Sequence, residues 1–351
     1  MLLLLAAYQV GGTGPAAPGE VTNSTSFAYL HHRSEQIYDG HGIWGQARHG
    51  YRMALRDSYW RADVYGFLAD ANPIYARRAG EAVDYLLKTQ SEGGSGVFGF
   101  PADVNNPEFG AKVRAVTEVC PACVHNGWIV ALPGKDIAEL YYDHGYALTT
   151  VARAYLRTKN HALLAPIVRA ADWILDKPLT TNINYLSALG KGLSYAYRVT
   201  NDPRYLNKAI QLHRDGILPL LGNMGSAIDT HNAQLEYHGF IVSGMIAVRQ
   251  SLPAGHIFIA ELDPILALAV ASMAKRGLAE NGAYGVTWPG TNLLAWHELS
   301  FLRLLTGEEA RARDRCLALI RSYMDPLTAE SSAFRFQKAL YTYFSIGLFA
   351  R

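Results

Sequence analysis

The chain has 351 residues, of which 50% are hydrophobic and 18% charged, and its net charge is +2 at pH 7. This apolar fraction supports a large core and excludes long disorder, and the lack of any run of Lys and Arg argues against nucleic acid as a partner. No segment reaches about 20 uninterrupted apolar residues, so we expect no membrane span.

The N-terminal segment, MLLLLAAYQVGGTGPAAPGE, is a short apolar run followed by small residues, Gly and Pro. It resembles the end of a secretory signal peptide whose basic beginning is missing. We therefore expect residues 1–25 to be a signal-peptide remnant or disordered, residues 26–351 to form a single catalytic domain, and the protein to be secreted or periplasmic.

One pattern recurs along the chain: an apolar helix, a polar turn and a second, amphipathic helix. Its four copies begin at Gly66, Ala154, Ala196 and Phe301. In two copies a proline follows Asn72 or Asp202, an arrangement typical of a capped helix start. One hairpin cannot bury its apolar faces alone, so successive hairpins must stack.

The apolar periodicity predicts a hairpin over 51–90 and helices over 135–158, 161–176, 183–200, 203–219, 235–251, 257–278, 292–306, 308–323 and 333–350. Apolar helices rich in Tyr and Gly alternate with more charged ones, as the inner and outer rings of a closed array would. We predict an all-α fold, an (α/α)6 or (α/α)7 toroid.

Residues 91–134 interrupt this rhythm, and insertions of this length in a compact domain are usually functional loops. Within it, Cys120 and Cys123 form a C-P-A-C sequence, and Cys316 stands apart. A CxxC pair can be half of a zinc site, a redox pair or a local disulfide. Because no second CxxC and no βαβ pattern accompany it, we expect a local disulfide or plain thiols, and no metal.

Aromatic and imidazole side chains are abundant, with 21 Tyr, 6 Trp and 12 His. Aromatic rings beside hydrogen-bonding groups suit stacking on sugars, although most single tyrosines in such a fold pack between helices. Trp44, Trp60 and Trp288 are candidate stacking platforms, and the mildly basic chain is compatible with an acidic polysaccharide.

Polar residues gather where the expected inner helices begin. The four junctions are YYDH at 141–144, TNINY at 181–185, DTHNAQLEYH at 229–238 and NGAYGVTWPGTN at 281–292. Their recurrence at the same stage of successive repeats places the expected active cleft there.

Two chemistries suit such a cleft. β-Elimination from a uronic acid needs a group that neutralises the carboxylate, a base and an acid, whereas glycoside hydrolysis needs two carboxylates across the scissile bond. The candidate carboxylates are Asp63, Asp143, Asp229, Glu236 and Glu298. Because the junctions hold more Asn, His and Tyr than acids, elimination is favoured. Hydrolysis by Asp143 or Asp229 with a second acid is the alternative, as is a non-catalytic sugar-binding protein.

His238 is the candidate base, and its other interpretation is a buried histidine bonded to a carbonyl. Tyr284, in a glycine-relieved loop, could reach the substrate and is the second catalytic candidate, so that His238 and Tyr284 act as base and acid in an order that the sequence does not fix. Asn182 and Asn184 are candidate neutralisers that could instead cap a helix. The substrate-binding set consists of Asn184, His144, Tyr142, Tyr237, His231, Trp44, Trp60, Arg61 and Trp288.

Four segments are informative together: YYDHGYAL, TNINYL, EYHGF, and LLKTQ followed by GGSGVFGFPADV. Through them the chain resembles the toroidal polysaccharide lyases, and polysaccharide lyase family 38 in particular, over most of residues 30–351. The resemblance implies a lyase on alginate or glucuronan with an Asn neutraliser, a His and a Tyr, for which Asn182 or Asn184, His238 and Tyr284 stand in the right order. An NNHSYW-like motif of a related alginate lyase family is absent, which leaves the substrate open. We expect a monomer without a cofactor.

Overall fold

A computed structural model gives the structure of the chain. It describes residues 31–32, 34–36, 38–42, 51–106, 110–133, 138–279, 292, 295–296, 298–299 and 307–323. The expected signal-peptide remnant, residues 1–25, lies outside these residues, as do the helix expected at 333–350 and most of that expected at 292–306.

Helices make up most of the described chain. The α-helices are α3 (Tyr51–Phe67), α4 (Pro73–Gly93), α5 (Gly110–Val119), α6 (Ala138–Thr158), α7 (Leu164–Leu175), α8 (Ile183–Thr200), α9 (Pro203–Gln211), α10 (Leu235–Ser251), α11 (Phe258–Leu278) and α13 (Gly307–Tyr323). Short 3-10 turns η2 (Pro121–Cys123), η4 (His161–Leu163) and η6 (Leu218–Leu220), a π-helical turn η5 (Leu212–Ile217) and strands β1 (Phe100–Pro101), β2 (Val124–His125) and β3 (Trp128–Ile129) complete them. None of these helices is long and apolar enough to span a bilayer.

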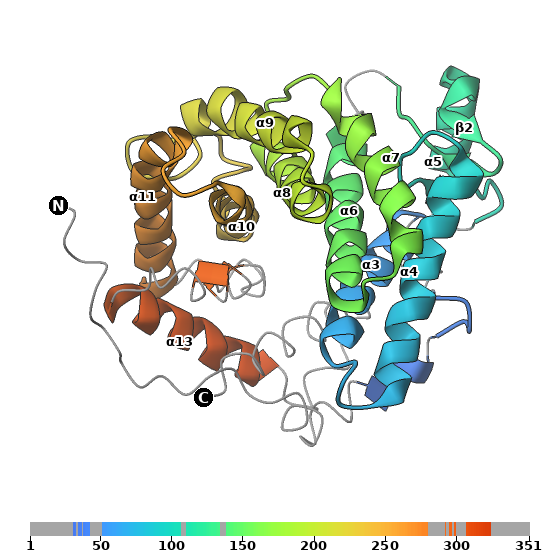
Figure 1. The fold of residues 1–351 in the computed structure, drawn as a ribbon, viewed down its shortest axis with the longest axis horizontal. Helices are drawn as coiled ribbons and strands as arrows, with labels where there is room; N and C mark the ends of the chain where they lie inside the picture. Colours follow the sequence, from blue (N-terminus) through green and yellow to red (C-terminus); the bar gives the residue numbers. More distant parts are fainter. Residues whose placement is uncertain are drawn as a thin grey trace.

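The helices pair into hairpins that stand side by side around an arc (Figure 1). The inner helices are α3, α6, α8 and α10, which contact one another in that order, and the outer helices are α4, α7, α9 and α11. Helices α8 and α10 are buried on nearly all sides, because their small and apolar residues face both the ring interior and the outer helices. The predicted all-α toroid is confirmed.

Two of the outer helices, α4 and α9, begin at the capping sequences predicted for them. Asn72 accepts a hydrogen bond from the backbone N–H of Ile74, and Asp202 accepts one from that of Arg204. Each cap is followed by a proline, whose missing N–H costs nothing in the first turn of a helix. The short turn between paired helices therefore has a local cause in the sequence.

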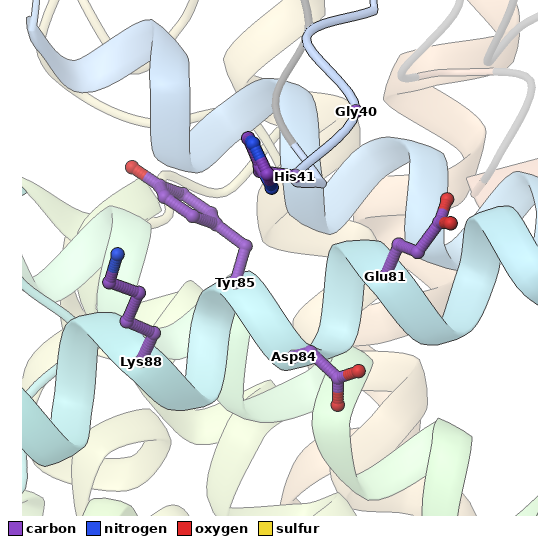
Figure 2. Close-up of a pocket in the computed structure, with 6 residues that line it drawn as sticks. All are labelled: Gly40, His41, Glu81, Asp84, Tyr85 and Lys88. Atoms are coloured by element: carbon purple, nitrogen blue, oxygen red, sulfur yellow. The ribbon is translucent and has the colours of Figure 1, made fainter.

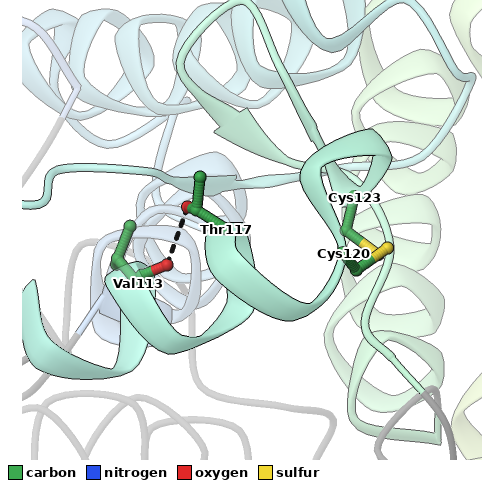
Figure 3. The surroundings of a disulfide bond; sticks show 4 residues. All are labelled: Val113, Thr117, Cys120 and Cys123. Carbon is green, nitrogen blue, oxygen red and sulfur yellow. Dashed lines mark hydrogen bonds between the residues drawn. A yellow bond between two sulfur atoms is a disulfide. The ribbon is translucent and has the colours of Figure 1, made fainter.

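The insertion after α4 has more structure than its sequence pattern indicated. It contains α5 and a three-stranded antiparallel sheet in the order β1-β3-β2. Each strand is only two residues long, too short to show alternation in the sequence. Cys120 and Cys123 form a disulfide directly after α5 (Figure 3), which is one of the two expected alternatives. No group of metal-binding side chains occurs in the described part of the chain.

Glycines allow the inner helices to approach backbone to backbone. A Cβ atom placed on Gly145 of α6 would lie 2.4 Å from the carbonyl of Ala188 on α8. A Cβ on Gly192 of α8 would in turn lie 2.8 Å from the carbonyl oxygen of Gly145. The α6–α8 contact is therefore closed to any larger side chain at these two positions.

We expect Gly145→Ala to lower the free energy of unfolding by about 1–3 kcal/mol, the usual cost of overpacking, because rigid backbone must move to admit the methyl group. Gly80→Ala is the matched control, since Gly80 is an exposed glycine in α4 with nothing near its Cβ position. That variant should gain roughly 0.5–1 kcal/mol from helix propensity. Urea denaturation measures both, and equal effects of the two substitutions would contradict the close-contact argument.

A buried ionic network joins inner helices across the ring. The Lys191 ammonium donates to Glu298 Oε1 at 2.6 Å and to Ser243 Oγ at 2.5 Å, and the Ser243 hydroxyl donates to Glu298 Oε2 at 2.5 Å. Arg153 donates to Glu298 at 3.1 Å and to Asp63 at 3.0 Å. These five residues, the interior ion network, thus link α3, α6, α8 and α10 to the segment at residue 298.

Candidate active site

A largely buried ion pair joins the second turn of α3 to the second turn of α6. The guanidinium of Arg56 donates to both carboxylate oxygens of Asp143, at 2.7 and 2.9 Å, and the hydroxyl of Tyr59 donates to the same carboxylate at 3.1 Å. Asp143 is fully buried, whereas the Arg56 side chain remains 21% exposed. Burial alone would lower the pKa of Arg56, but the attraction of Asp143 outweighs it and holds the pKa well above its ordinary value. A permanent cation therefore faces the starts of the inner helices.

A cluster of aromatic rings lies beside this cation. The ring centroid of Tyr142 lies 4.9 Å from that of Tyr146, 5.6 Å from that of Tyr185 and 5.4 Å from that of Phe240. The Arg56 guanidinium carbon lies 5.0 Å from the centre of the Tyr142 ring. Burial raises the pKa of the Tyr142 phenol well above its ordinary value, so that this group stays protonated and can only donate or accept a hydrogen bond as a neutral hydroxyl.

A chain of amides lies beside the aromatic rings, at the start of α8. Asn184 donates from Nδ2 to the side-chain oxygens of Asn182 and Asn232, each at 2.8 Å. Asn232 in turn donates from Nδ2 to both carboxylate oxygens of Asp229, at 3.1 and 3.0 Å. We call these four residues the amide chain. Asn182 occupies the N-cap position of α8 but makes no capping bond with its side chain.

His231 and Tyr237 lie next to the amide chain in sequence and in space. His231 is exposed, Tyr237 is half-buried, and their ring centroids are 4.4 Å apart. Burial and the charge of Glu236 raise the pKa of Tyr237, while Arg56 acts to lower it. An accessible imidazole and a protonated phenol are therefore in contact at this end of the ring.

His238 and His144 are both fully buried. His238 Nε2 lies 2.8 Å from the carbonyl oxygen of Ala269, and its Nδ1 is enclosed without a partner. His144 accepts from the backbone N–H of Phe98 at Nδ1 and lies 2.9 Å from the carbonyl oxygen of Ala170 at Nε2. Neither ring is exposed to a substrate, and both tie an inner helix to another element. For His238 this is the second of its two interpretations.

The buried histidines predict a loss of stability in acid. Burial lowers the pKa of His144, His213 and His238 from 6.5 to about 4. Between these values the unfolded chain binds protons that the folded chain does not, so stability is fully present above pH 6.5 and falls as the pH decreases toward about 4. Each histidine should contribute up to about 1.4 kcal/mol per pH unit in that window.

Urea denaturation across this pH range measures the slope. His213→Gln, which removes one buried imidazole remote from the inner-helix starts, should reduce it. His161→Asn is the matched control, because His161 is exposed, and it should leave the slope unchanged. An unaltered slope in His213→Gln would show that this histidine titrates alike in the folded and unfolded chains.

Of the remaining predicted site residues, two lie in the described part of the chain and three lie outside it. Arg61 is only 2% exposed, donates to Ser34 Oγ at 3.1 Å and lies 3.7 Å from Asp57, so it faces away from the ring interior. Trp60 is half-buried, edge-on to Tyr59. Trp44, Tyr284 and Trp288 lie outside the described residues, and their roles stay predictions.

Sequence reasoning missed Arg56, although a usable signal was present. Arg56, Tyr59 and Asp63 recur at intervals of three, four and seven residues, which places them on one face of α3. That face meets Asp143 and Arg153 of α6. Arg61, which the sequence analysis chose instead, lies on another face of the same helix.

A separate cavity of about 350 Å³ opens on the outer helix α4. Figure 2 shows the side chains that line it, which are Gly40, His41, Glu81, Asp84, Tyr85 and Lys88. No residue of the amide chain or of the aromatic group around Arg56 takes part in it. The candidate active site is therefore the inner-helix starts rather than this cavity.

Fold and site together define a helical toroid with a cationic and aromatic end. No protein-family model matches the sequence, and no curated protein matches it. Several solved structures share the fold. A polysaccharide lyase is 11% identical with a TM-score of 0.60, covering 95% of this chain and 98% of its own. An unsaturated glucuronyl hydrolase mutant from Streptococcus agalactiae, complexed with dGlcA-GalNAc6S, is 12% identical with a TM-score of 0.59, covering 97% and 94%.

The third structure is a glycosyl hydrolase of family 88 from Bacteroides vulgatus, 13% identical with a TM-score of 0.57, which covers 92% of this chain and 99% of its own. At these identities the likeness establishes the fold alone. The reaction must be argued from the side chains at the inner-helix starts.

Proposed function

We propose that this protein is a polysaccharide lyase that cleaves a uronic-acid polysaccharide of the alginate or glucuronan type by β-elimination. The observation that carries the proposal is that both acids considered for hydrolysis, Asp143 and Asp229, are already engaged by hydrogen-bond donors. Asp143 is held by Arg56, and Asp229 is held by Asn232. Donors from Arg56, Tyr59 and Asn232 thus occupy the oxygens of these two carboxylates, which suits neither a general acid nor a free nucleophile. The remaining groups are mainly donors.

Elimination needs such donors. The side-chain N–H₂ of Asn182 and the guanidinium of Arg56 can bind the uronate carboxylate and spread the charge that develops when the C5 proton leaves. His231 is the accessible base in place of the enclosed His238. It takes the C5 proton, the electron pair forms the C4–C5 double bond, and the C4–O bond breaks. The leaving oxygen receives a proton from Tyr237, with Tyr284 as the alternative donor.

The structural neighbours support a polysaccharide-processing enzyme, since they include a polysaccharide lyase and glycoside hydrolases. We further propose an exported monomer, without a cofactor, whose partner is the acidic polysaccharide itself. The Cys120–Cys123 disulfide supports export, because disulfides persist in oxidising compartments.

The test is to incubate the protein separately with alginate, glucuronan, pectate and hyaluronan and to record ultraviolet absorbance and reducing ends together. A lyase produces the absorbing unsaturated uronate and new reducing ends in equal amounts. Asn182→Ala should lose about 100-fold or more in turnover. Asn160→Ala, which changes an asparagine that caps an outer turn, is the matched control. Reducing ends without absorbance would overturn the lyase assignment.

A second candidate is a hydrolase that acts on an already unsaturated glucuronyl sugar. Burial raises the pKa of Tyr142 most, and the charges of Asp143 and Glu236 add to this effect, so two carboxylates act on the same phenol. Two of the structural neighbours are glycoside hydrolases. The same assay separates the candidates when an unsaturated oligosaccharide is the substrate, because this hydrolase consumes the ultraviolet absorbance that a lyase creates.

A further inference from the structure

We propose that Asp229 is a positioning residue that fixes which way the amide of Asn182 points, acting through Asn232 and Asn184. The inference rests on the proposed function, in which the N–H₂ of Asn182 binds the uronate carboxylate. It follows from the order of donors and acceptors along the amide chain, which has one obligatory acceptor at its far end.

The orientation of Asn232 is determined from both sides. Its Nδ2 lies 3.1 and 3.0 Å from the two carboxylate oxygens of Asp229, which can only accept. Its Oδ1 lies 3.1 Å from the backbone nitrogen of Asn184, which can only donate. The opposite flip of Asn232 would set two acceptors together at one end and two donors together at the other.

That orientation passes to Asn182. Because Asn232 presents an oxygen, the group of Asn184 that faces it must be the N–H₂, at 2.8 Å. The same N–H₂ lies 2.8 Å from the side chain of Asn182, which must therefore present its own oxygen inward. Asn182 is the half-exposed end of the chain, whereas Asn184 is fully buried and Asn232 is 3% exposed. The N–H₂ of Asn182 is consequently the donor left for a ligand.

The amide chain is not arranged for stability alone. Asn184 Oδ1 is buried and has no hydrogen-bond partner among the described residues, which costs about 1–3 kcal/mol. Asn182 occupies a capping position without using its side chain to cap. The segment that carries Asp229 is also held by other contacts, since Arg276 donates to the carbonyl of Ala233 and to Ser226 Oγ at 3.3 Å. A loss of stability of this kind indicates that the polar network serves to orient its side chains.

The charge state of Asp229 suits its role as the acceptor that orients Asn232. Burial acts to raise its pKa, but the N–H groups of Asn232 and His231 that bond to the carboxylate outweigh burial, and the pKa lies below its ordinary value. The carboxylate is therefore an anion, and only an acceptor, throughout the neutral range. The anchor is lost only as the pH falls through this lowered pKa.

A double-mutant cycle on turnover of whichever of the four polysaccharides the wild type cleaves tests the inference. Asp229→Asn offers Asn232 a donor as well as an acceptor, so it should lower kcat by about 10-fold or more with little change in KM. In an Asn182→Ala background the same substitution should have almost no further effect, because the group it positions is gone. Asp176→Asn, at an aspartate that is 79% exposed, is the matched control and should leave kcat unchanged.

The possible failures are distinguishable. If Asp229→Asn lowers kcat by the same factor with and without Asn182, the two residues act independently and the positioning inference is overturned while the lyase assignment stands. A fall in melting temperature with unchanged kcat overturns it as well. If the wild type releases no unsaturated product from any of the four polysaccharides, the proposed function fails, and the role of Asn182 toward a uronate fails with it.

Discussion

Replacing Lys191 with alanine is expected to lower the free energy of unfolding by about 3–5 kcal/mol, because it leaves a buried carboxylate without its closest cation. Burial acts to raise the pKa of Glu298, but the attraction of Lys191 and Arg153 outweighs burial and keeps the group ionised. Arg153 would still reach Glu298 at 3.1 Å, yet it also serves Asp63 and cannot replace the lost ammonium. Urea denaturation at neutral pH measures the change.

Two variants calibrate this expectation. Arg214→Ala breaks an exposed pair with Glu261, in which both side chains are more than two-fifths accessible, and should cost less than about 1 kcal/mol. The double variant Lys191→Met/Glu298→Leu removes both charges and should recover most of the stability that Lys191→Ala loses. If the double variant is as unstable as Lys191→Ala, packing rather than charge explains the loss.

Arg56→Ala is expected to lower turnover by about 100-fold or more. It is also expected to lower the free energy of unfolding. The substitution removes the cation proposed to bind the uronate. It also leaves Asp143, which is fully buried, with only the hydroxyl of Tyr59 as a hydrogen-bond partner among the described residues. Turnover and urea denaturation must therefore be measured on the same preparations.

Removing both partners separates the two effects. In Arg56→Met/Asp143→Leu no buried charge is left unpaired, so stability should largely return, whereas turnover should stay low because the cation is absent. Arg204→Ala, at an exposed arginine paired with Asp202, is the control for loss of one positive charge. Recovery of turnover in the double variant would show that Arg56 only supports the fold.

The helices were predictable because their causes are local. Asn72 and Asp202 cap the helices that follow them, and the apolar repeat marks which faces must be covered. The strands of the insertion were not predictable, since a two-residue strand such as Val124–His125 is defined by its partner Trp128–Ile129 rather than by its own pattern. Hairpin boundaries therefore matched the sequence prediction to within a few residues, and the insertion did not.

The candidate site was predictable as a region but not residue by residue. The junctions at 141–144, 181–185 and 229–238 do meet, through Tyr142, Tyr185 and the amide chain. Whether a histidine there is buried depends on remote backbone, as with His238 and the carbonyl oxygen of Ala269, 31 residues away. The partner of Arg56 lies 87 residues along the chain, and no local pattern reports such a pairing.

The interior ion network also limits where a ligand can bind in the described part of the ring. Lys191 lies beneath the aromatic rings, with its ammonium 6.0 Å from the centre of the Tyr146 ring, and Ser243 and Glu298 beside it are buried. In the described part of the chain, paired and buried charges therefore occupy the ring interior next to the aromatic rings. Under the proposed lyase function, the saccharide therefore binds at the inner-helix starts and not among the buried charges of this network.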